Sequence, residues 1–409
     1  MSEDPPHIVA KTAIVTPSTE IPADLRVMAR PEDVYEWDKQ IELCGVLSGF
    51  NDYQKERARR AFRFLRDEFG EAFLKEAYAE RHPILEYFAN LAPWTREWIV
   101  WFAESLKAVR KAGDYSGLRH RIRERDTFPE ALTVLDVAQR LTKVGFAVAF
   151  DPTVDFGDRA RVPDIQVRDT TTGETFYVEV SAAMPSLNET QAMESMQRVT
   201  QPIFLTIPFV RYCGRLPKTL SEPHLIEVIE QVKNLLDEVK ADGAFHELVI
   251  EGILELGVSG NADVDLLQKW ALQRGLEVGT FHGPRYDQNE VGRTKRKIGE
   301  EQKQLPSEVP NVVVIQNGRL FGHKQDVRSV IGQLEEEVYA HPNLLAAVVY
   351  GQHLGFDDPE TIMQGQHVYT KRAKAGFLQE ENIVLFNRFC ATKISPGLVT
   401  RMYEAFRVY

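Results

Sequence analysis

Apolar positions recur at three- and four-residue steps in the first third of the chain, which is the spacing of one helix face. The pattern is clearest over residues 54–69 and 93–109, where aromatic and aliphatic side chains alternate with charged ones. Residues 1–30 lack such a period and contain four prolines, which is typical of a flexible arm. The pattern therefore predicts an all-α N-terminal domain over residues 31–125 that follows this arm.

Two features of this helical region allow more than one interpretation. Trp94, Trp98 and Trp101 could form a platform on which bases stack, but their helical spacing favours the core of a helical bundle. The basic run at 119–125, RHRIRER, could contact phosphates or could be a solvated helix end before the next domain. We expect the tryptophans in the core and leave both interpretations of the basic run open.

The pattern changes at residue 126, where short apolar runs begin to alternate with helical ones. Residues 127–130, TFPE, fit a capping box with a proline in the first turn, and Gly145 is expected to stop the helix that follows. Short strands are expected next, at 146–150, 161–168 and 175–180.

A long insertion is expected at about 186–290. Within it the pattern predicts a helix at 186–200, a strand at 202–210, a helix at 222–240 and a strand at 247–258. After it come a charged helix at 293–305, an unbroken apolar strand at 309–315, a helix at 324–339 and a strand at 344–350. This order predicts an α/β domain over 126–352, in which helices flank a mixed sheet. Residues 353–409 carry little pattern; we expect an extension packed on that domain, with one strand at 383–389.

Composition narrows the function without assigning one. The formal charge of -11 argues against a large non-specific footprint on nucleic acid, although phosphate contacts need only a local basic surface. Three widely separated cysteines argue against a disulfide framework and a cysteine zinc site. No GxxxxGK[ST], HExxH or GxSxG motif appears. Without a visible signal peptide or an apolar stretch of membrane length, the sequence predicts a cytoplasmic protein with no membrane partner.

Two acidic residues stand on neighbouring predicted strands. Asp164 follows a proline where one strand opens, and Glu179 lies inside the apolar run of the next. A buried carboxylate is unfavourable unless it is paired or binds a cation. Magnesium takes oxygen ligands, keeps several waters and needs only two or three carboxylates. The pair therefore predicts a Mg²⁺ or Mn²⁺ site, to which Glu130 or Asp136 on the preceding helix would add a ligand or a group that orients water.

The Pro-Asp pair at 163–164, the sequence Glu-Val-Ser at 179–181 and the order of the elements resemble the PD-(D/E)XK nuclease superfamily, which has the restriction-endonuclease-like fold. The resemblance covers roughly half of the chain. It implies a metal-dependent nuclease that hydrolyses DNA or RNA, with Asp164, Glu179 and Glu130 as metal ligands. Many members of that superfamily act in restriction, repair or anti-phage defence, which is an analogy at the level of the fold.

One position departs from the family pattern. Members usually carry a lysine two residues after the second acid, but Ser181 stands there and supplies no positive charge. Some members bring this lysine from another element. The helix expected at 293–305 resembles the one that precedes the last core strand in related sequences, and its candidates are Lys297, Lys303 and Gln304.

Helical geometry does not choose among these three candidates. Ile298 and Leu305 are one heptad apart and should face the sheet. Lys297 and Gln304 flank that apolar stripe on one side, and Lys303 flanks it on the other.

Other charged residues near the expected site have weaker assignments. Basic side chains that could meet phosphates are Arg159, Arg161, Arg293, Lys295 and Arg296. The acidic loop beside the site, with Asp151, Asp155 and Asp158, is expected to be solvated rather than to bind metal.

Two other functions stay open. In one, Ser181 marks lost catalysis, and the chain is a nuclease-like scaffold or a nucleic-acid-binding subunit of a larger assembly. In the other, the chain is a protein-interaction module that binds no nucleic acid. A protein partner or a homo-oligomer is compatible with each of these functions.

Overall fold

The computed structural model describes residues 34–46, 50–91, 93–155, 160–183, 186–206, 209–260, 263–284, 289–321, 326–354, 358–375, 378–392 and 394–407. Only the backbone is described at Pro93, Trp94, Asp155, Ala160, Arg161, His353, Leu354, Lys374, Ala375 and Leu378. The arm expected at 1–30 lies outside the described residues. None of the described helices combines the length and the apolar character that a membrane span requires.

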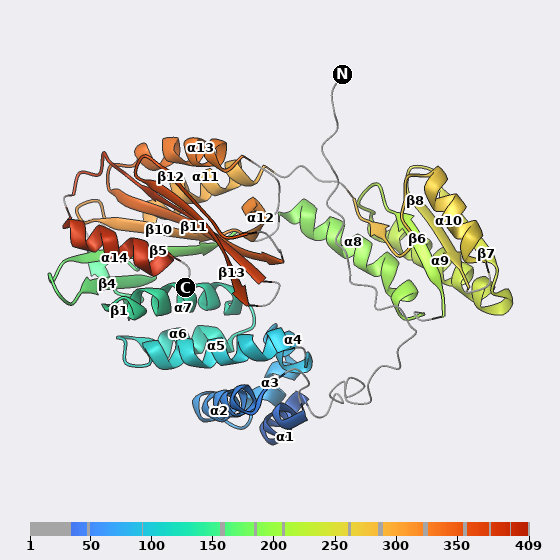
Figure 1. Cartoon of the computed structure of the whole chain (residues 1–409), viewed down its shortest axis with the longest axis horizontal. Coiled ribbons are helices and arrows are strands. Elements are labelled where there is room, and N and C mark those ends of the chain that lie inside the picture. Colours follow the sequence, from blue (N-terminus) through green and yellow to red (C-terminus); the bar gives the residue numbers. More distant parts are fainter. Residues whose placement is uncertain are drawn as a thin grey trace. The chain divides into compact units, whose positions relative to one another are not determined.

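The described residues divide into two compact units (Figure 1). One is formed by those of Met184–Gln288, and the other by those of Ile21–Ala183 and Asn289–Tyr409. The candidate acids Glu130, Asp164 and Glu179 belong to the second, larger unit.

The larger unit begins with a helical layer. Its described α-helices are α1 (Trp37–Leu43), α2 (Asp52–Phe69), α3 (Phe73–Ala79), α4 (Leu85–Ala89), α5 (Pro93–Val109) and α6 (Tyr115–Arg123). Asn51 and Gln54 form a reciprocal capping box at the start of α2, and α2 ends at Gly70, whose φ of 86° suits glycine. The prediction of helices in this region is confirmed.

The described tryptophan side chains of α5 belong to the core. Trp98 and Trp101 are partly buried against the main hydrophobic core, and Trp98 stacks on Tyr87 with ring centroids 3.6 Å apart. The core interpretation is therefore confirmed for these two residues.

A mixed sheet of eight strands follows, in the order β1-β4-β5-β10-β11-β14-β13-β12. Its strands are β1 (Phe146–Phe150), β4 (Ile165–Asp169), β5 (Thr175–Ala182), β10 (Asn311–Gln316), β11 (Leu344–Leu354), β12 (Glu360–Gln364), β13 (His367–Ala375) and β14 (Leu378–Phe386). β10 runs parallel to β5 and β11, and the other neighbouring pairs are antiparallel. The prediction of an α/β fold with a mixed sheet is confirmed.

Helices cover both faces of this sheet (Figure 1). α7 (Phe128–Lys143) and α14 (Pro396–Phe406) share a core with Val178 and Val180, whereas α11 (Glu290–Glu301) and α13 (Val327–Tyr339) share one with Tyr177. Successive side chains of a strand point to opposite faces. Glu179, two residues from Tyr177 on β5, therefore points to the face that α11 covers.

Two sequence predictions beside the candidate site are wrong. The strand expected at 161–168 is interrupted, because Pro163 has no N–H for a ladder; only Ala160–Arg161 (β3, paired with β2, Val154–Asp155) and β4 are strands. The capping box at 127–130 does not form, because the Thr127 hydroxyl donates to the Arg121 carbonyl at 2.7 Å and the backbone of Thr127 is helical.

The smaller unit has a four-stranded sheet in the order β7-β8-β6-β9. Its elements are α8 (Leu187–Phe204), β6 (Arg211–Arg215), α9 (Glu222–Asp242), β7 (Phe245–Ile250), β8 (Leu254–Ser259), α10 (Val264–Gln273) and β9 (Phe281–His282). The strand expected at 202–210 is wrong, because Pro202 and the buried Ile203 belong to the last turn of α8. The long strand expected at 247–258 is instead a hairpin, which turns at Gly252 with a φ of 65°.

Candidate active site

Asp164 and Glu179 lie on neighbouring strands of the β4–β5 hairpin. Ile165 pairs with Val178, so Asp164, one residue before β4, comes opposite Glu179. The Val180 N–H donates to Asp164 Oδ2 at 2.9 Å. The β4–β5 ladder ends at the pair Ile165–Val178, and the Asp164 carboxylate accepts from a β5 amide just beyond it. Local sequence thus fixes this carboxylate.

Both carboxylates are buried, with 7% of each residue exposed. Glu179 Oε2 has no hydrogen-bond partner among the described residues. Burial, followed by the charges of Asp164 and Glu301, raises the pKa of Glu179 to about 9. Burial also raises the pKa of Asp164 to about 6, although the Val180 N–H and the Arg121 guanidinium oppose that rise. The ionised form of Glu179 is therefore unfavourable in the metal-free protein unless a cation neutralises it.

The end of α11 adds a third buried carboxylate, Glu301, which is 6% exposed. Lys297 Nζ lies 2.9 Å from its Oε1, and Gln304 Nε2 donates to its Oε2 at 2.8 Å. Ile298 and Leu305 are buried against the sheet, as predicted. Glu301 falls between these two on the inward face of the helix, so the apolar period could have identified it.

The two candidate acids of α7 have different surroundings. Glu130 is exposed, and its charge contributes to the raised pKa of Asp164 and of Glu179. Asp136 is 5% exposed and pairs with Arg140 at 3.0 Å, on the face of the sheet that α7 covers. The fold therefore brings Glu130, but not Asp136, to the carboxylate pair.

Arg121, which belongs to the basic run at 119–125, reaches Asp164 from the helical layer. Its Nη1 lies 3.4 Å from Asp164 Oδ1, and its Nη2 lies 3.0 Å from Asp151 Oδ1. The Asp151 side chain is 33% exposed and pairs with Arg121, so it is only partly solvated. Arg121 and Asp164 are 43 residues apart, and no local period signals such a contact.

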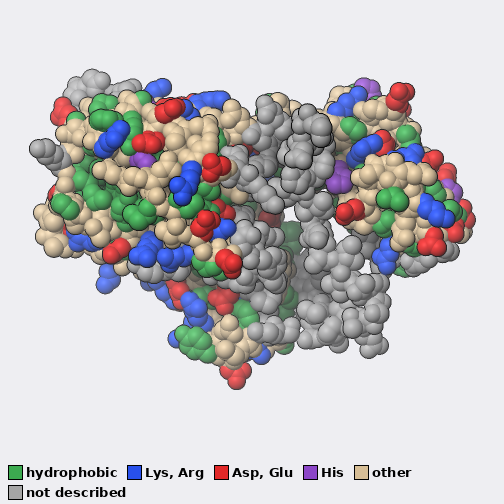
Figure 2. Space-filling view, turned by 45° about the horizontal axis from the view of Figure 1, so that its top comes forward, with side chains coloured by type: hydrophobic (Ala, Val, Ile, Leu, Met, Phe, Trp, Pro, Cys, Tyr) green, Lys and Arg blue, Asp and Glu red, His purple; other side chains and the backbone are tan. Residues whose placement is uncertain are grey.

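The other basic candidates whose side chains the structure describes are exposed or pair with acidic residues of α11 and α13. Lys303 lies exposed in the 3₁₀ turn Gln302–Gln304, Arg293 pairs with Glu290 at 2.6 Å, and Lys295 lies 3.4 Å from Glu336. The Arg296 side chain is exposed. Outside the described residues lie Arg159, Asp158 and the side chains of Arg161 and Asp155. Basic and acidic side chains are interspersed on the face seen in Figure 2.

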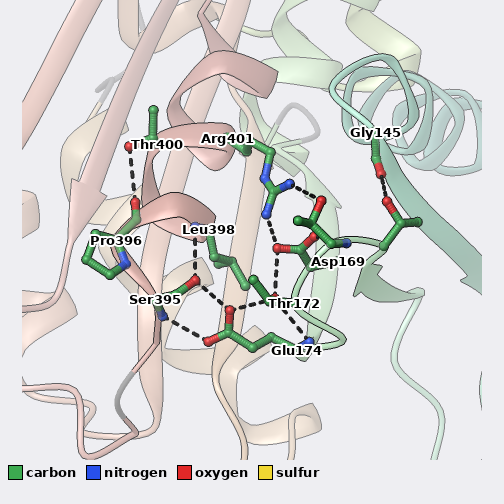
Figure 3. A network of polar contacts seen from close by, with 11 residues as sticks. Gly145, Asp169, Thr172, Glu174, Ser395, Pro396, Leu398, Thr400 and Arg401 are labelled. Atoms are coloured by element: carbon green, nitrogen blue, oxygen red, sulfur yellow. Dashed lines mark hydrogen bonds and ion pairs between the residues drawn. The ribbon is translucent and has the colours of Figure 1, made fainter.

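The far end of the hairpin is fastened to α14 (Figure 3). Ser395, the N-cap of α14, donates from its backbone and its hydroxyl to Glu174 at 2.9 and 2.6 Å. Arg401 of α14 forms an ion pair with the fully buried Asp169. The turn between β4 and β5 is therefore held by a C-terminal helix whose sequence gave no functional signal.

The carboxylate oxygens around Glu179 suit a hard divalent cation. Glu179 Oε2, which accepts no hydrogen bond from the described residues, could coordinate such a cation. The described residues include no group of three or more His, Cys, Asp or Glu side chains arranged to hold a metal ion. A cation here would rest on Asp164 and Glu179 together with water, which is coordination that magnesium accepts.

Comparisons with protein families, with curated proteins and with solved structures found no significant match to this chain.

Proposed function

We propose that this chain is a metal-dependent nuclease of the PD-(D/E)XK type that hydrolyses phosphodiester bonds of DNA or RNA. The observation that supports it best is the buried pair Asp164 and Glu179, in which Glu179 Oε2 lacks a partner among the described residues. These two residues would hold Mg²⁺ or Mn²⁺, with the exposed Glu130 beside them. Such a cation, when bound, lowers the pKa of water and neutralises charge on a phosphate.

The chain's own residues would position these groups. The Val180 N–H fixes Asp164, and the clamp of α14 on the hairpin turn fixes the strands that carry both acids. Glu130, on the solvent side, would take up the proton of the attacking water. Lys297 of α11, whose Nζ lies 2.9 Å from the buried Glu301, would replace the motif lysine.

The order of helices and strands also supports this proposal. The resemblance implies the order helix, three strands, helix, strand. In this chain α7 is followed by the antiparallel strands β1, β4 and β5, and α11 is followed by β10, which runs parallel to β5. A role in restriction or anti-phage defence is the family analogy and belongs to the same proposal.

A cleavage assay tests the proposal. Purified protein would be incubated with plasmid, linear duplex, single-stranded DNA and RNA, each with Mg²⁺, Mn²⁺ or EDTA. We expect metal-dependent cleavage that falls by at least roughly 100-fold in Asp164→Asn and in Glu179→Gln. Glu300→Gln, which removes an exposed carboxylate next to Glu301, is the matched control and should leave the rate unchanged. Cleavage that survives both site substitutions would contradict the assignment.

A second function, that of an inactive nuclease-like scaffold or nucleic-acid-binding subunit, is favoured by one observation. Ser181 is buried, with 6% exposed, at the position where the family carries its lysine. This alternative expects no cleavage of any substrate and no metal-dependent rise in melting temperature. Cleavage lost in Asp164→Asn and in Glu179→Gln would exclude it.

A further inference from the structure

Arg121 brings a positive charge to the carboxylate site from outside the β5 motif. Its side chain is 25% exposed, and it lies between Asp164 and Asp151. Its Nε and Nη2 are buried and find no hydrogen-bond acceptor among the described residues, although Nη2 is within ion-pair distance of Asp151. The guanidinium therefore retains donors that its two carboxylate neighbours do not use.

The helical layer holds α6 so that Arg121 points to the sheet. Arg119 Nη1 lies 3.5 Å from Glu68 Oε1 of α2, and Arg123 Nη1 donates to the Phe69 carbonyl at 3.2 Å. The sequence left two interpretations of the run 119–125 open, a phosphate-binding face and a solvated helix end. In the structure the run also makes ion pairs and hydrogen bonds within the protein. Arg121 lies two residues from each of those arginines, so its side chain leaves the opposite side of α6 and contacts Asp164.

We propose that Arg121 is a catalytic residue whose guanidinium binds a non-bridging oxygen of the scissile phosphate and adds a second positive charge to that of Lys297. This inference rests on the proposed nuclease function and adds to it a catalytic group from the N-terminal helical domain. A guanidinium presents several N–H groups in a planar fork that matches phosphate, and its charge persists in a partly buried site.

Kinetics of Arg121 variants test this role against that of a mere counterion to Asp164. We expect Arg121→Gln to lower kcat by roughly 100-fold with a much smaller change in KM, because the contact strengthens as charge develops on the phosphate. Arg121→Lys keeps a point charge without the fork and should recover part of that loss. Arg110→Gln is the charge-matched control, because Arg110 is 59% exposed and pairs with Glu68 rather than with the site.

Melting temperatures of each variant separate folding from catalysis. A counterion role would lower the melting temperature and the active fraction while the folded protein kept its kcat. An unchanged kcat in folded Arg121→Gln would overturn the inference and leave the nuclease proposal standing, provided that Asp164→Asn and Glu179→Gln abolish cleavage.

If the wild-type protein cleaves nothing, the nuclease proposal fails, and phosphate binding by Arg121 is then measured directly. Anisotropy of a labelled single-stranded oligonucleotide in EDTA should show affinity weakened roughly tenfold in Arg121→Gln relative to Arg110→Gln. Equal affinities of these two variants would overturn the phosphate contact, and a difference would support it without catalysis.

Discussion

Ser395 donates both its backbone N–H and its hydroxyl to the carboxylate of Glu174, at 2.9 and 2.6 Å. Glu174 ends the turn between β4 and β5, and Ser395 caps α14, 221 residues later. The two strands leave this turn side by side; Asp164 comes one residue before β4, and Glu179 lies opposite it within β5. The C-terminal helix therefore fixes the register of the strands that form the candidate site.

Loss of the Ser395 hydroxyl should weaken the attachment of α14 to the β4–β5 turn. Ser395→Ala removes the N-cap acceptor for the Leu398 N–H and one hydrogen bond to Glu174, so we expect about 1–2 kcal/mol lower stability towards urea. Ser395→Thr keeps a hydroxyl and should retain most of the wild-type value. Equal stability of Ser395→Ala and the wild type would show that α14 does not hold the hairpin through this residue.

The buried charge of Glu179 should make the metal-free protein less stable as pH rises. The pKa of Glu179 is about 9 in the folded state and 4.5 when unperturbed. The folded state therefore binds its proton more tightly than the unfolded state, and the stability present below pH 4.5 is lost progressively as pH rises to 9. We expect Glu179→Gln to be more stable than the wild type in EDTA at pH 7, by on the order of 2 kcal/mol.

Melting temperatures between pH 5 and 9 in EDTA measure this effect. The gap between Glu179→Gln and the wild type should widen with pH across that range. Glu300→Gln, the exposed neighbour on α11, should follow the wild-type curve. Parallel curves for Glu179→Gln and the wild type would show that Glu179 carries no buried-charge penalty.

Arg140 and Asp136 should matter for stability rather than for chemistry. Arg140 forms a bidentate pair with the fully buried Glu380 at 2.8 and 2.9 Å and a second pair with Asp136. Arg140→Met would leave two buried carboxylates without their cation, and we expect a loss of about 3–5 kcal/mol in urea unfolding. Asp136→Asn keeps the pair with Glu380 and should be milder. If nuclease activity is found, Asp136→Asn should retain it in the folded fraction, unlike Asp164→Asn.

Sequence periods predicted those elements whose packing is local and regular. The helix expected at 93–109 coincides with α5, because its apolar stripe faces one core along its whole length. The strand expected at 202–210 was wrong, because an apolar run of that length suits the last turn of a buried helix as well as a strand. Residues 353–409 carried little pattern, yet β14 pairs with β11 at the centre of the sheet.

In the candidate site, too, some residues could be predicted from local sequence and others could not. Asp164 and Glu179 were predicted because a proline and an apolar run mark their strands. Glu301 could have been found from the inward stripe of its helix. The basic run that contains Arg121 was noted, but its contact with Asp164 and the hydrogen bonds between Ser395 and Glu174 could not have been predicted, because contacts between distant segments depend on how helices pack and leave no period in the sequence.

The choice between Lys297 and Lys303 for the missing motif lysine can be decided by matched substitutions. Lys297 lies 2.9 Å from Glu301, whose charge acts on Glu179, whereas Lys303 is exposed in the turn after α11. We expect Lys297→Met to lower the cleavage rate by at least roughly tenfold, since a charge near the reacting phosphate is lost. Lys303→Met removes the same charge from the same segment and should stay within about twofold, because surface charges act weakly through water. Melting temperatures would exclude a folding defect in Lys297→Met. A larger loss in Lys303→Met than in Lys297→Met would reverse the assignment and place the missing charge on the other side of the Ile298–Leu305 stripe.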